Sequence, residues 1–87
     1  MRIEEYFREI DEAIQSCEIL RLSDLAFEKR GSHEGFIKGS LSFLDGSVLH
    51  LREYVDVEAE LDRIMYVYHY TNSSNHMIFR YDNTGHH

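Results

Sequence analysis

The sequence has one cysteine, few basic residues and no long apolar run, and each shortage excludes a class of protein. Cys17 has no second cysteine with which to form an internal disulfide, which fits a reducing compartment. No apolar run approaches the roughly 18–20 residues that a membrane-spanning helix requires. The acidic, amphipathic start MRIEEYFREI differs from a signal or transit peptide. We therefore expect a cytoplasmic protein that does not contact a membrane.

Basic residues are outnumbered by acidic ones, nine against 16, and the formal net charge is −7. This balance argues against broad binding of nucleic acid, because contacts to phosphates need a basic face. It is compatible with a local basic site on an acidic protein. An acidic surface also attracts a basic protein partner through charge complementarity.

Familiar signatures of catalysis are missing too. The sequence contains no Gly-rich phosphate loop, no HExxH, no pair of cysteines and no nucleophile elbow. It also lacks proline, internal repeats and low-complexity tracts. The content of 43% hydrophobic and 13% aromatic residues is that of a globular chain, and 87 residues leave room for one core. We expect a single domain spanning residues 1–87.

Residues 3–17 are predicted to form an amphipathic helix. Acidic residues are concentrated in its first turns, where they interact favourably with the positive end of the helix dipole. Its apolar residues recur at i, i+4, i+7, i+11 and i+14, which predicts one core-facing stripe; they are Ile3, Phe7, Ile10, Ile14 and Cys17.

Beyond the helix, apolar residues alternate with polar ones, which predicts strands. The expected strands span residues 19–29, 36–44, 47–57, 63–70 and 76–82. We expect a bulge near Ser23-Asp24, and a two-residue hairpin turn of the primed type at Asp45-Gly46. Short loops require antiparallel neighbours. The predicted fold class is α+β, with the N-terminal helix packed on a curved, meandering antiparallel sheet of about five strands and one sheet face left uncovered.

Glu53 interrupts the apolar alternation of the third predicted strand. A carboxylate in a core-facing register is costly unless it is paired or hydrated. With simple registers through the two hairpins, Glu53 shares a face with Tyr66, Tyr68, Arg80 and Asp82, and Arg80 is its expected partner. The group is interpreted either as a structural ion pair or as part of a functional site.

Histidines form a second candidate group. The same registers place His69 beside His50, with Arg52 on the same face, and a pair of imidazoles is suited to general acid–base chemistry. The competing interpretation is a structural histidine packed among aromatic residues. His86 and His87 could bind a transition metal together with another histidine, but adjacent histidines in an extended segment point to opposite sides. We expect no metal and no cofactor.

Several segments, taken together, resemble the TumE-like proteins, a family of small bacterial and archaeal toxin components of toxin–antitoxin pairs. The resemblance covers nearly the whole chain, and its most specific part is the closing Arg-Tyr-Asp-Asn-x-x-His-His with the upstream Arg-Glu-Tyr. Thr84-Gly85 stands where the family more usually has Ala-Pro. The segments are Leu44-Asp45-Gly46-Ser47, Leu49, Arg52-Glu53-Tyr54-Val55-Asp56, Tyr66-Val67-Tyr68-His69-Tyr70, Phe79-Arg80-Tyr81-Asp82-Asn83 and His86-His87.

The resemblance implies a cytoplasmic toxin-like protein whose usual partner is a helix-turn-helix antitoxin. It also implies a set of polar site residues, which are the positions that match the family's polar motif. These positions are Arg52, Glu53, Tyr68, His69, Arg80, Asp82, Asn83, His86 and His87.

Two functions are compatible with the residues. The first is a metal-independent ribonuclease, which needs a base for the ribose 2′-hydroxyl, an acid for the leaving oxygen and a cation for the charged phosphorane. In this hypothesis the base is His69 or Glu53, the acid is His86 or His87, and the cation is Arg52 or Arg80. Aromatic and amide side chains would bind the bases, namely Tyr66, Tyr68, Tyr70, Tyr81 and Asn83.

The second function is a non-enzymatic interaction module. It would bind a basic helix-turn-helix partner through the open face of the sheet, and the same sheet could also form a homodimer. Convergence of Arg80, Glu53 and the histidines in one cleft would favour the enzyme.

Overall fold

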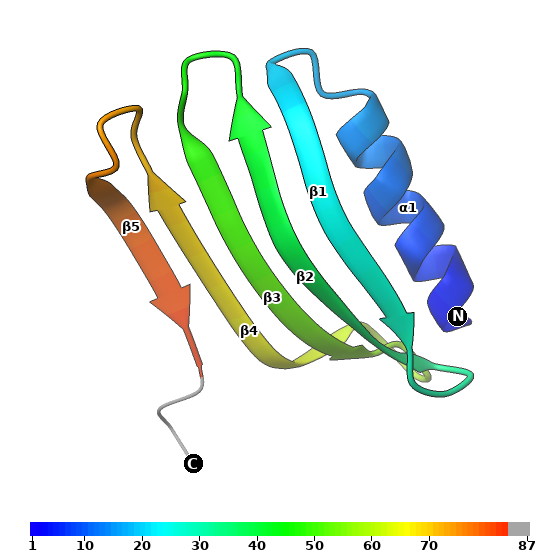
Figure 1. Cartoon of the computed structure of the whole chain (residues 1–87). Helices are drawn as coiled ribbons and strands as arrows, with labels where there is room; N and C mark the ends of the chain where they lie inside the picture. The colour runs from blue at the N-terminus through cyan, green and yellow to red at the C-terminus, as the bar shows by residue number, and fades with distance from the viewer. Residues whose placement is uncertain (84–87) are drawn as a thin grey trace.

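A computed structural model of the chain describes residues 1–83 and shows one helix and a five-stranded antiparallel sheet (Figure 1). The strands pair in chain order, β1-β2-β3-β4-β5, so the predicted α+β class and meander are confirmed. Within the described residues, no helix is long and apolar enough to cross a membrane. The elements are α1 (Ile3–Gln15), β1 (Leu20–Lys29), β2 (Glu34–Phe43), β3 (Val48–Asp56), β4 (Asp62–Thr71) and β5 (Met77–Asp82).

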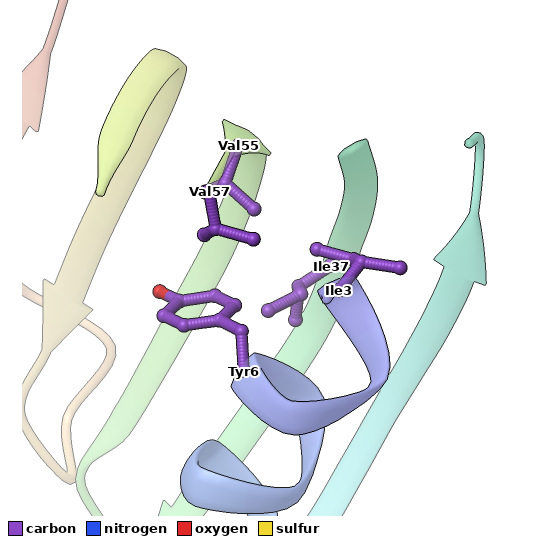
Figure 2. Close-up of a cluster of buried hydrophobic side chains, with 5 residues drawn as sticks. All are labelled: Ile3, Tyr6, Ile37, Val55 and Val57. Atoms are coloured by element: carbon purple, nitrogen blue, oxygen red, sulfur yellow. The ribbon is translucent and has the colours of Figure 1, made fainter. Parts of the chain in front are cut away.

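The core lies between the first turns of α1 and the two strands β2 and β3, toward the C-terminal end of β3. Ile3 and Tyr6 of α1 point toward Ile37 of β2, toward Val55 near the end of β3, and toward Val57, which follows β3 (Figure 2). All five side chains are at most 4% exposed. The predicted apolar stripe therefore faces the sheet as expected, and Tyr6, which was not assigned to the stripe, is buried beside it.

The turn between β2 and β3 differs from the predicted two-residue turn. Phe43 N–H donates to the Ser47 carbonyl over 2.9 Å, and Gly46 N–H donates to the Phe43 carbonyl over 3.0 Å. Gly46 has a φ of 85°, whereas Asp45 is not among the residues with positive φ. The loop therefore has three residues, a type I turn followed by a left-handed glycine.

The predicted bulge is misplaced, and two further shifts of register were not predicted. The bulge of β1 lies between Leu20 and Leu22, not at Ser23-Asp24. In β4, Ile64 is the extra residue between two registered pairs, Tyr54 with Met65 and Val55 with Arg63. In β5, Ile78 is the extra residue between two registered pairs, Tyr70 with Phe79 and Thr71 with Met77.

The β5 bulge decides which side chains share a face of the sheet. Because side chains alternate along a strand, one extra residue reverses the face of every residue that follows it. Arg80 therefore pairs with His69, and Asp82 pairs with Val67. The predicted Glu53–Arg80 pair is wrong, because the two side chains lie on opposite faces.

We name the two faces by their covering. The helix face is the side covered by α1. Side chains that point to the same side as Ile37 lie on it, among them Glu53 and Tyr66. The open face is the opposite side of the sheet. Side chains that point to the same side as His50 lie on it, among them His69 and Arg80.

Candidate functional site

A hollow of about 790 Å³ lies on the open face and crosses the strands of the sheet. Cross-strand pairs arrange its polar lining: Lys38 lies opposite Arg52, His50 opposite His69, and His69 opposite Arg80. Residues that face each other in an antiparallel pair point to the same side of the sheet, which is why residues from all five strands line the hollow.

The two histidines are close enough to act on one group. Their ring centroids are 6.1 Å apart and their planes are nearly perpendicular, at 80°. Arg80 Nη1 lies 3.2 Å from His69 Nδ1, and Arg80 Nη2 donates to Asp82 Oδ2 over 3.1 Å. Because a guanidinium can only donate, His69 Nδ1 is the acceptor, and the proton of the neutral ring is on Nε2. The expected His50–His69 neighbourhood is confirmed.

Lysine and arginine side chains give the open-face hollow a basic character on an acidic protein. Lys38, Arg52 and Arg80 line it, and Asp24 is the acidic side chain among its described lining residues. The Arg52 guanidinium also lies 5.8 Å from the centroid of the Phe36 ring. Lys38 was missed by sequence reasoning, although its position in the polar register of β2, opposite Arg52, is a signal that could have identified it.

Glu53 belongs to a different environment on the helix face. It is 7% exposed and accepts hydrogen bonds from Tyr6 Oη, over 2.9 Å, and from Tyr68 Oη. Arg63 Nε lies 3.5 Å from its Oε2. A buried carboxylate with this many donors is compensated for its lost hydration. Glu53 therefore joins α1 to β4, and the sheet separates it from the histidines. Of the groups expected to converge in one cleft, Arg80, His50 and His69 do so, whereas Glu53 does not.

The two tyrosines that donate to Glu53 are themselves perturbed. Burial raises the pKa of Tyr6 to about 12, and the negative charge of Glu53 adds to this effect. Burial also raises the pKa of Tyr68, with the hydrogen bond to Glu53 as the next cause. Both hydroxyls are therefore kept protonated as donors to the carboxylate.

We expect the free energy of unfolding to fall as the pH rises from about 10 to about 12. Unfolded tyrosine ionises near 10, whereas Tyr6 keeps its proton up to about 12 in the folded state. In that window the folded state binds more protons than the unfolded state, so stability falls with pH, by roughly 1–2 kcal/mol. Urea unfolding at a series of pH values measures this loss. Tyr6→Phe should reduce it, whereas Tyr81→Phe, a control at a 61% exposed residue, should retain it; an undiminished loss in Tyr6→Phe would contradict the assignment.

Tyrosines predicted to bind substrate lie on the helix face, across the sheet from the histidines. Tyr66 and Tyr68 stack with centroids 5.4 Å apart, and Tyr70 stacks on Phe79 at 5.2 Å. Tyr81 shares their face, in register with Tyr68. The open face has an aromatic pair of its own, Phe36 and Tyr54, with ring centroids 6.4 Å apart.

Asn83 is engaged with the backbone of β4. Its Oδ1 accepts from Tyr66 N–H over 2.8 Å, and its Nδ2 donates to the Ile64 carbonyl over 3.2 Å. The side chain therefore fastens the end of β5 to β4. His86 and His87 lie outside the described residues, and their predicted role as acids stays a prediction.

Metal-ligating side chains are dispersed over the described part of the chain. Within residues 1–83, no group of three or more His, Cys, Asp or Glu residues could hold a metal ion. The described groups of the open-face hollow are instead suited to proton transfer and to binding an anion.

Comparison with models of known protein families matches residues 10–87 to the family described as Toxin TumE. No curated protein and no solved structure matches the chain. The matched residues make up most of the sequence and include all the strands and the polar residues of both faces. The chain therefore belongs to the TumE toxin family.

Proposed function

We propose that this protein is the toxin of a toxin–antitoxin pair and that it cleaves RNA at the open-face hollow by acid–base chemistry without a metal ion. The observation that carries the proposal is the position of His69, with His50 on one side and Arg80 on the other. Two imidazoles and an arginine supply the base, the acid and the cation that cleavage of a phosphodiester requires.

Spacing of the two rings fits a single phosphodiester. A proton-transferring group must come within about 3 Å of its partner atom, so rings with centroids 6.1 Å apart can contact different oxygens of one phosphate. One imidazole takes the proton of the ribose 2′-hydroxyl while O2′ forms a bond to phosphorus. The other gives a proton to the 5′ oxygen as its bond to phosphorus breaks, which leaves a 2′,3′-cyclic phosphate and a 5′-hydroxyl.

Cations of the hollow stabilise the charge that builds up on the phosphorane. Arg80 already donates toward His69, so a phosphate at this position would compete for its guanidinium and release His69 Nδ1 for proton transfer. Lys38 and Arg52 lie in the same hollow and extend the basic surface along the RNA backbone. Phe36 and Tyr54 supply an aromatic surface for a neighbouring base.

The open face is less suited to the alternative of a basic helix-turn-helix partner. Lys38, Arg52 and Arg80 would repel a basic surface placed on this face. Glu53, which would attract such a surface, is buried on the helix face. Within the described lining of the hollow, where Lys38, Arg52 and Arg80 outnumber Asp24, charge therefore favours an anionic ligand.

Cleavage of a single-stranded RNA oligonucleotide by the purified full chain in the presence of EDTA tests the proposal. We expect cleavage that leaves 5′-hydroxyl ends, and no cleavage of the same sequence with 2′-O-methyl ribose, because the attacking hydroxyl is blocked. The proposal is wrong if folded protein leaves the RNA intact, or if it cleaves both oligonucleotides at the same rate.

A further inference from the structure

An apolar groove on the helix face is only partly covered by α1. Two hollows of about 320 Å³ and about 420 Å³ open on this face and adjoin at Phe43, which lines both; together we call them the groove. The first lies between the second half of α1 and the sheet. The second reaches Tyr70 of β4 and Phe79 of β5. In Figure 1, α1 lies at the β1 side of the sheet, and β5 lies at the far side from it.

Large apolar side chains at the rim of this groove are exposed. Ile19 is 62% exposed and Leu44 is 65% exposed, and both line the second hollow. Leu41, Phe43 and Leu49, which form its floor, are only half-buried. Contiguous exposed apolar surface of this kind on a small protein marks an interaction site.

Charge distinguishes this groove from the open-face hollow. The charged residues among its described lining are Glu53 and Asp45, both acidic. Helix α1, which forms one wall, exposes Glu9, Asp11 and Glu12. RNA needs cations for its phosphates and is therefore disfavoured here, whereas a basic protein segment is complementary.

We propose that this groove is the docking site for an amphipathic helix of a partner protein that carries lysine or arginine beside its apolar face. Apolar residues at helical spacing would fill the two hollows. The flanking basic residues would face Asp45 and the acids of α1. The antitoxin that a toxin family implies is the source of such a helix. Docking here requires no chemistry at the histidines and leaves the open face accessible.

Binding of a synthetic amphipathic peptide tests the docking site. The probe is a helix of about 18 residues, or five turns, with a leucine stripe flanked by lysines, and its binding is measured by fluorescence anisotropy. We expect Ile19→Asp and Leu44→Asp, at exposed rim residues, to weaken binding at least ~10-fold. The matched control is Leu22→Asp, because Leu22 is 57% exposed but pairs with Ser42 in the register of the open face. It should bind as the parent does, and a peptide with glutamate in place of lysine should bind at least ~10-fold more weakly.

Several outcomes would overturn this proposal. They are no binding of the lysine peptide to the folded parent, equal binding of the two peptides, and binding that Leu44→Asp leaves unchanged. A parent dimer that dissociates in Leu44→Asp would assign the groove to a second copy of the chain. Loss of RNA binding in Leu44→Asp, with Leu22→Asp unaffected, would assign it to nucleic acid. RNA cleavage measured on the same variants keeps the two proposals apart, because Leu44→Asp should cleave RNA at the parent's rate.

Discussion

Replacing His69 with alanine should abolish growth arrest and lower RNA cleavage at least ~100-fold. General acid–base catalysis by one positioned side chain typically contributes about 10²–10⁴-fold, and His69 is the imidazole that touches both His50 and Arg80. The measurement is the cleavage rate of purified His69→Ala on the RNA oligonucleotide, together with growth after induced expression in cells.

The matched control for this variant is His76→Ala. His76 is an exposed histidine in the β4–β5 loop and does not line the open-face hollow, so its removal should leave both arrest and cleavage unchanged. Circular dichroism and thermal melting of both variants establish that they are folded. Full cleavage by folded His69→Ala would remove this residue from the mechanism, and equal losses in the two variants would indicate a nonspecific effect.

Gly39→Ala should lower the free energy of unfolding strongly, although it adds only one methyl group. Gly39 lies in the middle of β2 with a φ of +144°, which side chains rarely adopt. A Cβ on it would lie 1.9 Å from the backbone carbonyl oxygen of Asp24. Because that atom belongs to a paired strand, relief requires β1 to move. We expect a loss of about 3 kcal/mol, which lowers the melting temperature by roughly 12–24 °C for a domain of this size.

Thermal unfolding followed by circular dichroism checks this value, with Gly31→Ala as the control. A Cβ on Gly31 meets no atom within 4 Å, and Gly31 is not among the glycines with positive φ. Its substitution should change the melting temperature by only a few degrees. Equal stability of the two alanine variants would show that β1 and β2 do not approach each other at Gly39 as the structure has them.

Periodicity was sufficient to predict the helix and the five strands. Burial of one face spaces the apolar residues at the period of the element, which is visible in the sequence. The stripe from Ile3 to Cys17 has the helical period, and the residues from Ile37 onward alternate as in a strand. Every predicted end lies within two residues of the observed one. Loop length then fixed the antiparallel order, because short connections can join only neighbouring strands.

Register was predictable for only some of the candidate residues. The His50–His69 pair was predicted correctly although the β3–β4 ladder shifts between Tyr54 and Val55, and from Tyr54 to His50 the residues of β3 pair one to one with those of β4. The Glu53–Arg80 pair failed because Ile78 is inserted as a bulge, and no residue type in β5 signals that insertion. Because of this one extra residue, Arg80 lies on the open face beside His69 and not on the helix face beside Glu53.

Partners of Glu53 were unpredictable for a different reason. Tyr6 comes from α1 and Arg63 from the start of β4, so both contacts depend on how the helix docks and how the strand bends. Helix docking and strand bending cannot be predicted from the local pattern of apolar and polar residues. The sequence did identify Glu53 as a buried carboxylate in need of partners, and that interpretation is confirmed by its 7% exposure.

Mapping of new 5′-hydroxyl ends in cellular RNA after induced expression tests the central claim most directly. The comparison is between the parent chain and a folded His50→Ala/His69→Ala variant. We expect new 5′-hydroxyl ends to accumulate with the parent as growth stops, and to be absent with the variant. Growth arrest by the parent without new RNA ends, or the same ends with the variant, would contradict RNA cleavage by the histidine pair of the open face.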